Sequence, residues 1–301
     1  MWLRNRDKTK NMDENKVYSR IDRGPVDPVT GKERREPLEV LVAALQENDI
    51  TLAERMNLST DAVICNQCQE VSYREFERKG HRIRTIAFNE RGVGRNRNNA
   101  LMRASAEIVL FADEDIVYDD DYEQSVLKAF EENPQADLLT FNVRAVEGRR
   151  TYENRKVKPV RWYNYGRYPT YSVAARLDSL RRANVWFSLL YGGGAPYSNG
   201  EDSLFLHDCL KKGLKIWAVP VEIGHEAVRE DGSSTWFNGY NEKFFYDRGV
   251  LYRDLYGRLA VCMALRFLLA HRKIMCQELT IGDAFHIMRK GIRLEPILKQ
   301  E

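Results

Sequence analysis

The chain has 301 residues, 43% hydrophobic and 30% Asp, Glu, Lys or Arg, which allows a sizeable core and argues against global disorder. Its formal net charge of +3 is too small to indicate nucleic acid as the main partner, because nucleic-acid binders concentrate basic charge more strongly. No apolar run reaches the roughly 18–20 residues of a membrane span, and the first residues lack the apolar segment of a signal peptide, so the sequence predicts a cytoplasmic protein.

The first 37 residues differ in composition from the rest of the chain. They are polar and charged and contain Gly24-Pro25, Pro28 and Pro37, which predicts a flexible or loosely docked arm over residues 1–37. From residue 38 onward, short apolar runs alternate with helical patterns. Strands are predicted at 38–45, 61–66, 82–88, 107–112 and 137–143, and helices at 52–58, 73–79, 96–104 and 122–132.

This alternation indicates βαβ units and a parallel sheet, in which ligands bind beyond the carboxyl ends of the strands. Later in the chain we expect a helix at 201–210, a strand at 214–219 that ends at Pro220, and helices from Trp236 onward. The sequence therefore predicts an α/β domain over residues 38–230 and a helical C-terminal region over residues 231–301.

Two aspartates follow the apolar run at 107–112. In an extended segment residues i and i+2 point the same way, so Asp113 and Asp115 are expected to converge on one divalent cation, Mn²⁺ or Mg²⁺. Such a cation would balance the charge of a nucleotide diphosphate and stabilise it as a leaving group. The alternative is an acidic loop at a helix start, because Asp119–Asp121 follow and acidic residues favour helix N-termini.

A second acidic pair, Glu201-Asp202, follows the glycine-rich segment 191–200 at the start of a predicted helix. Simple stabilisation of the helix N-terminus is one explanation of these carboxylates. Inverting sugar transfer, however, needs a carboxylate that deprotonates the acceptor hydroxyl as it attacks. We therefore expect Asp202 to be the general base, with the loop at 192–200 closing over donor and acceptor.

These signals occur in a recognisable order: Asn89 to Leu101 with Gly92 and Arg97, then Asp113-Glu-Asp115, then Glu201-Asp202. Over residues 38–225 the chain resembles family 2 glycosyltransferases of the GT-A fold. The resemblance implies a Rossmann-like, mostly parallel sheet flanked by helices, with a helical C-terminal extension. It also implies inverting transfer of a sugar from a nucleotide-diphosphate sugar, a UDP-sugar in the first instance, to a saccharide or lipid-linked acceptor.

The resemblance assigns roles residue by residue. The nucleotide sugar would be bound by Asn66, Arg97, Asp113 and Glu201, and the catalytic base would be Asp202. The metal ligands would be Asp113, Asp115 and His225. Three positions depart from the family pattern: Asn66 replaces an acidic residue, Ile116 replaces a third acidic residue after the aspartate pair, and 43–48 lacks the usual first-strand motif.

Longer stretches resemble bacterial family 2 enzymes of surface polysaccharide assembly, namely 161–169, 199–205 and 242–252. The basic and aromatic segment 155–168 is interpreted as an acceptor contact. Single-stranded nucleic acid or an ordinary partly buried loop are the alternatives.

The apolar stretch 259–270 carries flanking basic residues. It predicts a packing helix or a homo-oligomer interface, with weak attachment to the inner face of a membrane as the alternative. Two other functions compete with sugar transfer. A nucleotidyltransferase would want a glycine-rich basic loop after the first strand, where Gln46–Asp49 stands instead. A catalytically silent nucleotide-sugar-binding module would not need Asp202.

Overall fold

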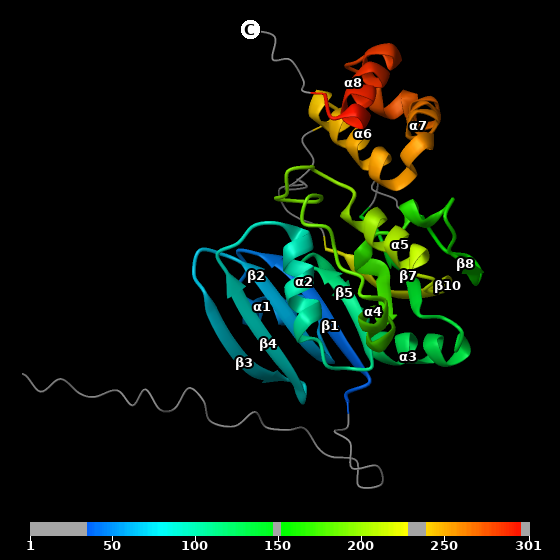
Figure 1. Cartoon of the computed structure of the whole chain (residues 1–301). Coiled ribbons are helices and arrows are strands. Elements are labelled where there is room, and N and C mark those ends of the chain that lie inside the picture. The colour runs from blue at the N-terminus through cyan, green and yellow to red at the C-terminus, as the bar shows by residue number, and fades with distance from the viewer. Residues whose placement is uncertain (1–34, 147–151, 228–238, 296–301) are drawn as a thin grey trace, which may run out of the picture. The chain divides into compact units, whose positions relative to one another are not determined.

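A computed structural model of the chain describes residues 35–146, 152–227 and 239–295 (Figure 1). The chain divides into two units, residues 1–35 and residues 36–301, and all described helices and strands belong to the second. The arm predicted for residues 1–37 therefore lies outside the described residues, apart from its last three positions.

Four parallel strands form one part of the sheet. They are β1 (Leu38–Leu45), β2 (Asp61–Gln67), β4 (His81–Phe88) and β5 (Ile108–Asp113), in the spatial order β4-β2-β1-β5. Successive residues of a strand point to opposite faces, so Leu41 joins one core cluster while Val40 and Val42 join another. Parallel strands buried on both faces read as continuous apolar runs, which explains why these four were predictable from sequence.

Helices cover both faces of this sheet. The cluster that contains Val40 also holds residues of α1 (Asp49–Arg55) and α3 (Tyr122–Glu132). The cluster that contains Leu41 holds residues of α2 (Val93–Arg103), α4 (Leu177–Ala183) and α5 (Glu201–Lys211). The predicted α/β fold with a helix-flanked sheet is confirmed.

The sheet continues beyond β5 with mixed pairing. The short strand β9 (Val173–Arg176) lies antiparallel between β5 and β7 (Leu138–Arg144), and β10 (Ile216–Glu226) runs parallel to β7. Two further strands pair antiparallel with β10: β6 (Ile116–Tyr118) and β8 (Lys158–Pro159). The prediction that the late strand ends at Pro220 is wrong, because register shifts between Ala218 and Glu222 accommodate a residue that cannot donate to the ladder.

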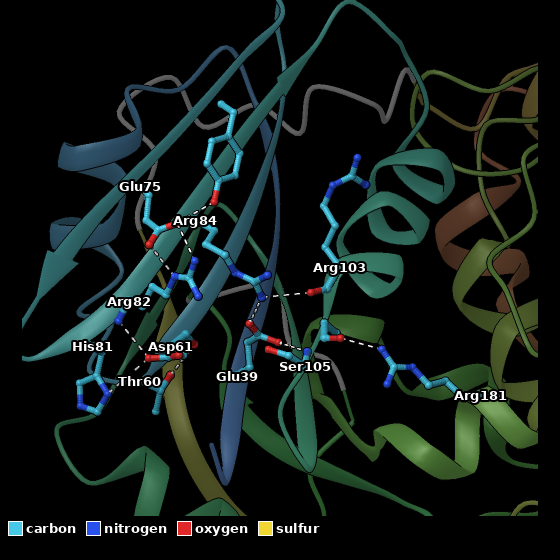
Figure 2. Close-up of polar contacts among 12 residues, drawn as sticks. Glu39, Thr60, Asp61, Glu75, His81, Arg82, Arg84, Arg103, Ser105 and Arg181 are labelled. Carbon is cyan, nitrogen blue, oxygen red and sulfur yellow. Dashed lines mark hydrogen bonds and ion pairs between the residues drawn. The ribbon is translucent and has the colours of Figure 1, made fainter. Parts of the chain in front are cut away.

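The predicted helix at 73–79 is also wrong. This segment is the edge strand β3 (Ser72–Arg78), which pairs antiparallel with β4. Lys79 and Gly80 join the two strands with positive φ angles of 50° and 81°, as in a two-residue type I′ turn. Glu75 and Arg82 stabilise the hairpin through a bidentate ion pair (Figure 2).

The amino ends of the strands are held by a polar network (Figure 2). The Glu39 carboxylate is buried, pairs with Arg84 and accepts a hydrogen bond of 2.8 Å from the Ser105 amide. Arg84 also donates to the Arg103 carbonyl, and Arg181 donates to the Ala104 carbonyl. This network fixes the edge of the sheet opposite the carboxyl ends of β1, β2, β4 and β5.

The predicted helical C-terminal region is present as α6 (Glu242–Tyr256), α7 (Ala260–Met275) and α8 (Ile281–Arg293) (Figure 1). Helices α6 and α8 pack closely through two glycines. A Cβ on Gly249 would lie 2.2 Å from the Met288 carbonyl oxygen, and one on Gly291 would lie 2.2 Å from the Tyr246 carbonyl oxygen. Among the described helices, none has the length and hydropathy needed to cross a bilayer.

Candidate active site

One buried guanidinium brings together three of the predicted carboxylates. Arg97 lies on α2, and its side chain is 4% exposed. Its Nη2 donates to Asp113 Oδ1 at 2.7 Å, and its Nη1 donates to Asp202 Oδ1 at 3.0 Å and Glu201 Oε1 at 3.3 Å. The Arg97 guanidinium therefore contacts carboxylates that lie more than 100 positions away in the chain.

Asparagines on α2 position this arginine. Asn96 donates to the carbonyl groups of Ala44 and Cys65, which ties the helix to the carboxyl ends of β1 and β2. Asn98 exchanges two hydrogen bonds with the backbone of Phe187. The Phe187 ring in turn contacts the Arg97 guanidinium, 5.4 Å from ring centroid to Cζ.

The carboxylates come from the end of β5 and the first turn of α5. Asp113 is the last residue of β5, and Glu201 and Asp202 open α5 after Gly200. Glycine is required at position 192, because a Cβ there would lie 2.7 Å from the Glu201 carboxyl carbon and φ is +99°. The glycine-rich segment thus makes room for the Glu201 side chain beside Arg97.

Arg97 and Glu201 form the inner part of the site, and the more exposed Asp113 and Asp202 form its outer part. The side chains of Asp113 and Asp202 are 32% and 31% exposed, whereas that of Glu201 is 13% exposed. Thr170 donates a short hydrogen bond to Asp202 Oδ1, the same oxygen that Arg97 contacts. Among the described residues, no group donates to Asp202 Oδ2 or Asp113 Oδ2, so each partly exposed carboxylate keeps one oxygen for a ligand.

The electrostatics follow from burial and proximity. Burial opposes the charge of Arg97, but the carboxylates of Asp113, Asp202 and Glu201 outweigh it and raise the pKa of the guanidinium. Burial, together with the neighbouring Asp202 charge, raises the pKa of Glu201 to about 7, although Arg97 acts in the opposite direction.

The two aspartates of the predicted metal pair are presented by a turn. The expected alternation stops at Asp113, because Glu114 and Asp115 form the turn between β5 and β6. The Asp115 carbonyl accepts a hydrogen bond of 2.7 Å from the Ala227 amide, one residue beyond the pairing of β6 with β10. The expectation that 113–115 is extended is therefore wrong, although both aspartates remain at the carboxyl end of β5.

His225 lies on β10 opposite Val117 of β6, and the backbone contact of Ala227 with Asp115 lies two residues further along the chain. His225 Nδ1 is buried and has no hydrogen-bond partner among the residues that the structure describes. A metal-ligand role would supply one.

These residues fit a divalent cation that is shared with a ligand. Within residues 35–146, 152–227 and 239–295, no three His, Cys, Asp or Glu side chains form a ready-made metal cage. Mg²⁺ at phosphate sites commonly takes only one or two carboxylates from the protein and the rest of its oxygens from phosphate and water. Asp113 Oδ2 and the orphaned His225 nitrogen are compatible with that arrangement.

Asn66 lies at the carboxyl end of β2, as expected, and is buried. Its side chain is used within the protein: Nδ2 donates to the Glu47 carbonyl at 2.6 Å and to Asp49 Oδ1 at 3.2 Å, and Oδ1 accepts from the Glu47 amide. Asn66 therefore shapes the loop after β1, and it does not join the residues around Arg97.

The glycine-rich loop is anchored on both sides. Ser198 donates from its amide and its hydroxyl to Asp247 of α6, both at 2.8 Å, and Tyr191 donates to Asp254 of the same helix. The Val93 amide at the start of α2 donates to the Gly193 carbonyl. Closure of this loop stays a prediction, and it would have to break or carry along these contacts.

Sequence reasoning missed Thr170 and the asparagines that flank Arg97. Thr170 follows the basic and aromatic segment 155–168, but a lone threonine carries no signal of its contact with Asp202. Asn96 and Asn98 stand within the motif that carried the family resemblance, and helical spacing places them on either side of Arg97. Their use as anchors could have been suspected there.

Comparisons with known proteins find a matching family model and solved structures of similar fold. Residues 64–185 match the family model described as glycosyl transferase family 2, a range that contains Arg97, Asp113 and Asp115 but not Asp202. Among solved structures, the chain is similar to S. aureus TarS 1-349 in complex with UDP-GlcNAc, with 15% identity over 86% of this chain and 83% of that chain and a TM-score of 0.55.

Two further solved structures show the same likeness. S. aureus TarS 1-349 in complex with UDP has 14% identity, the same coverage and a TM-score of 0.53. S. aureus TarS has 15% identity over 87% of this chain and 50% of that chain, with a TM-score of 0.53. A search of curated proteins by sequence finds no match. The resemblance to family 2 is confirmed for residues 64–185, and the GT-A-like fold is confirmed for the larger part of the chain.

Proposed function

We propose that this chain, whose residues 64–185 match the family 2 glycosyltransferases, transfers a sugar from a nucleotide-diphosphate sugar to a saccharide or lipid-linked acceptor. The single observation that carries the proposal is the meeting of Asp113, Glu201 and Asp202 around the buried Arg97. The two outer carboxylates each keep an oxygen for a ligand, at the carboxyl end of the parallel strands where such sheets bind nucleotides.

In the proposed reaction Asp202 is the general base. Its Oδ1 is held by Arg97 and Thr170, which leaves Oδ2 to take the proton of the acceptor hydroxyl. The acceptor oxygen attacks the anomeric carbon as the bond from that carbon to the diphosphate oxygen breaks. Attack opposite the leaving group inverts the configuration, and the nucleoside diphosphate carries away the bonding electron pair.

Asp113, Asp115 and His225 are the residues proposed to hold a divalent cation, Mn²⁺ or Mg²⁺. Such a cation supplies positive charge to the departing diphosphate. Arg97 keeps Asp113 in place at the end of β5 and limits repulsion among the carboxylates. Glu201, the least exposed of the three carboxylates around Arg97, is proposed to contact the donor sugar or its phosphates.

The acceptor is proposed to contact the basic and aromatic segment 155–168, which lies just before Thr170. Trp162 and Tyr163 are exposed, and Arg161 and Arg167 flank them in sequence. Exposed rings stack on sugars, and arginine pairs with phosphate, which suits a saccharide or lipid-linked diphosphate. The hydrogen bond from Thr170 to Asp202 joins this segment to the proposed base. The resemblance to polysaccharide enzymes supports a role in surface polysaccharide synthesis.

The test is incubation of the protein with a panel of nucleotide sugars in Mn²⁺, Mg²⁺ or EDTA. UDP-GlcNAc comes first, because a structural neighbour is in complex with it. We expect slow release of nucleoside diphosphate from one donor, abolished by EDTA. Pyrophosphate release from a nucleoside triphosphate and a sugar phosphate would indicate a nucleotidyltransferase, and donor binding without any release would indicate a silent binding module.

The base is tested by Asp202→Asn. Asparagine keeps an oxygen for Arg97 and Thr170 but cannot take a proton at neutral pH, so we expect turnover to fall at least about a hundredfold. Stabilisation of the protein by UDP in thermal unfolding should be retained. Asp208→Asn on the same helix is the matched control, because the Asp208 side chain contacts His207 and is not among the carboxylates that Arg97 binds. Near-normal turnover of the Asp202 variant would remove Asp202 from the role of base.

A further inference from the structure

The helix α7 presents apolar side chains on two faces. Its inner face packs into the core through Ala260, Ala264 and Leu268, which are buried. Its outer face carries Val261, Leu265 and Leu269 at intervals of four residues, and these side chains are 41%, 42% and 52% exposed. One helical turn separates each from the next, so they form a continuous stripe.

The ionised side chains around this outer stripe are all basic. From Leu255 to Gln277 the chain contains no Asp or Glu, whereas Arg258, Arg266, Arg272 and Lys273 are all present. At 100° per residue, Arg272 falls beside Val261 and Leu265, and Lys273 and Arg266 fall just beyond Leu269. None of these four basic side chains forms an ion pair with another described residue.

We propose that this outer face of α7, defined by Val261, Leu265, Leu269, Arg266, Arg272 and Lys273, docks on a lipid surface that carries negative charge, with Arg258 just before the helix adding to the basic charge. A helix of 16 residues is about 24 Å long and can lie in the plane of the headgroups. The leucines enter the boundary with the acyl chains, and the arginines and lysine contact anionic headgroups.

Charge complementarity selects this occupant over the other candidates. A second copy of the chain placed face to face would bring two sets of unpaired basic side chains together, which costs free energy. A nucleic acid would use the basic residues but would leave the exposed leucines without a role. An anionic bilayer can contact both kinds of side chain, because its headgroups carry negative charge for the basic residues and its acyl chains accept the apolar residues.

The experiment is co-sedimentation of the full chain with vesicles of phosphatidylcholine alone or mixed with phosphatidylglycerol. We expect binding to the mixed vesicles, little binding to the neutral ones, and a decrease with added salt. Arg266→Gln and Arg272→Gln should each weaken binding about fivefold, since a basic residue near such a surface contributes about 1 kcal/mol. Leu265→Ser combined with Leu269→Ser should weaken it further at every salt concentration.

Matched controls are Val71→Ser, an exposed apolar residue elsewhere, and Lys128→Gln, an exposed basic residue on α3. Both should bind vesicles as the unchanged protein does. Thermal unfolding of the α7 variants should match that of the unchanged protein, because the substituted side chains are exposed.

Equal binding to neutral and anionic vesicles, or no binding to either, would overturn the proposal. A concentration-dependent dimer in analytical ultracentrifugation that the Leu265→Ser, Leu269→Ser variant abolishes would instead identify the face as a subunit interface. No donor or acceptor is present in these measurements, so their outcome is separate from that of the nucleotide-sugar panel.

Discussion

The buried Arg97 offsets the negative charge of three carboxylates, so its removal should lower the stability of the folded protein. Arg97→Met leaves Asp113, Glu201 and Asp202 close together without a cation. We expect the free energy of unfolding to fall by about 3 kcal/mol, as for other buried pairs that lose one partner. Urea unfolding measures the change.

Arg97→Lys is the matched variant. It restores the charge but offers a single nitrogen where the guanidinium uses Nη1 and Nη2 for different carboxylates. Its stability should lie between those of the Met variant and the unchanged protein. Equal stability of all three proteins would show that the carboxylates do not depend on Arg97.

Glu201 predicts a pH dependence whose sign can be worked out. Its pKa is raised from 4.5 to about 7 in the folded chain, mainly by burial. The folded state therefore holds the proton more tightly than the unfolded state. Its contribution to stability is complete below pH 4.5 and is lost as the pH rises through about 7.

The measurement is urea unfolding of the unchanged protein and Glu201→Gln across this range, in EDTA and without donor. Glutamine stays neutral, so the unchanged protein should lose stability relative to the variant as the pH rises, by at most about 3 kcal/mol. Glu132→Gln, at an exposed carboxylate on α3, should show no such trend. A constant difference between the two proteins would contradict the raised pKa.

The site was predictable in its members more than in its arrangement. Asp113, Arg97, Glu201 and Asp202 were chosen from motif order, and the structure brings them together. Asn66 was chosen as a ligand contact, but its amide is occupied by Glu47 and Asp49. The pairing of Arg97 with carboxylates of α5 depends on contacts across more than 100 residues, which no local pattern encodes.

At the scale of elements, the close crossing of α6 and α8 depends on glycine. The Gly249 site is filled by the Met288 carbonyl of the partner helix. Gly249→Ala should force the helices apart and lower the free energy of unfolding by about 1–3 kcal/mol. Gly282→Ala, on α8, is the control, because a Cβ there would meet only the Thr280 hydroxyl, at 3.7 Å. Thermal unfolding of both variants gives the comparison, and similar melting temperatures would contradict the close packing.

The elements that sequence predicted well are those with strong local patterns. The buried parallel strands β1, β2, β4 and β5 read as apolar runs, and α3 was placed at its observed bounds. The strand β3 is an edge strand with few apolar residues, so its sequence lacks the apolar run that marks the buried strands, and Gly80 after it is the second residue of a tight turn. The short β6, β8 and β9 are fixed by pairing partners elsewhere in the chain.

At the scale of the molecule, the C-terminal helices share a core with the α/β part. One hydrophobic cluster contains Phe205 of α5 together with Phe245 and Leu251 of α6. Residue Gly200, just before Glu201 and Asp202, is held against the Leu251 side chain, since a Cβ there would lie 2.6 Å from it. The predicted boundary near residue 230 therefore does not separate independent cores.

A chain that ends at residue 240 should accordingly fail to fold by itself. It would expose the apolar surface of α5 and lose the contacts of Ser198 and Tyr191 with α6. We expect no cooperative thermal transition, and strong binding of a dye that reports exposed apolar surface. A sharp transition in the shortened protein, with UDP still raising its melting temperature, would show that residues 36–240 are a complete folding unit.

The positive charge of Arg97 among the carboxylates should affect the order in which the proposed cation and nucleotide bind. A bare divalent cation would have to share Asp113 with a guanidinium that repels it. A cation that arrives on a diphosphate brings compensating negative charge, and the phosphates attract Arg97 where the metal alone would not. We expect weak affinity for Mn²⁺ alone and strong synergy between Mn²⁺ and UDP in titration calorimetry, so that the cation and the nucleotide enter together as one complex of lowered negative charge.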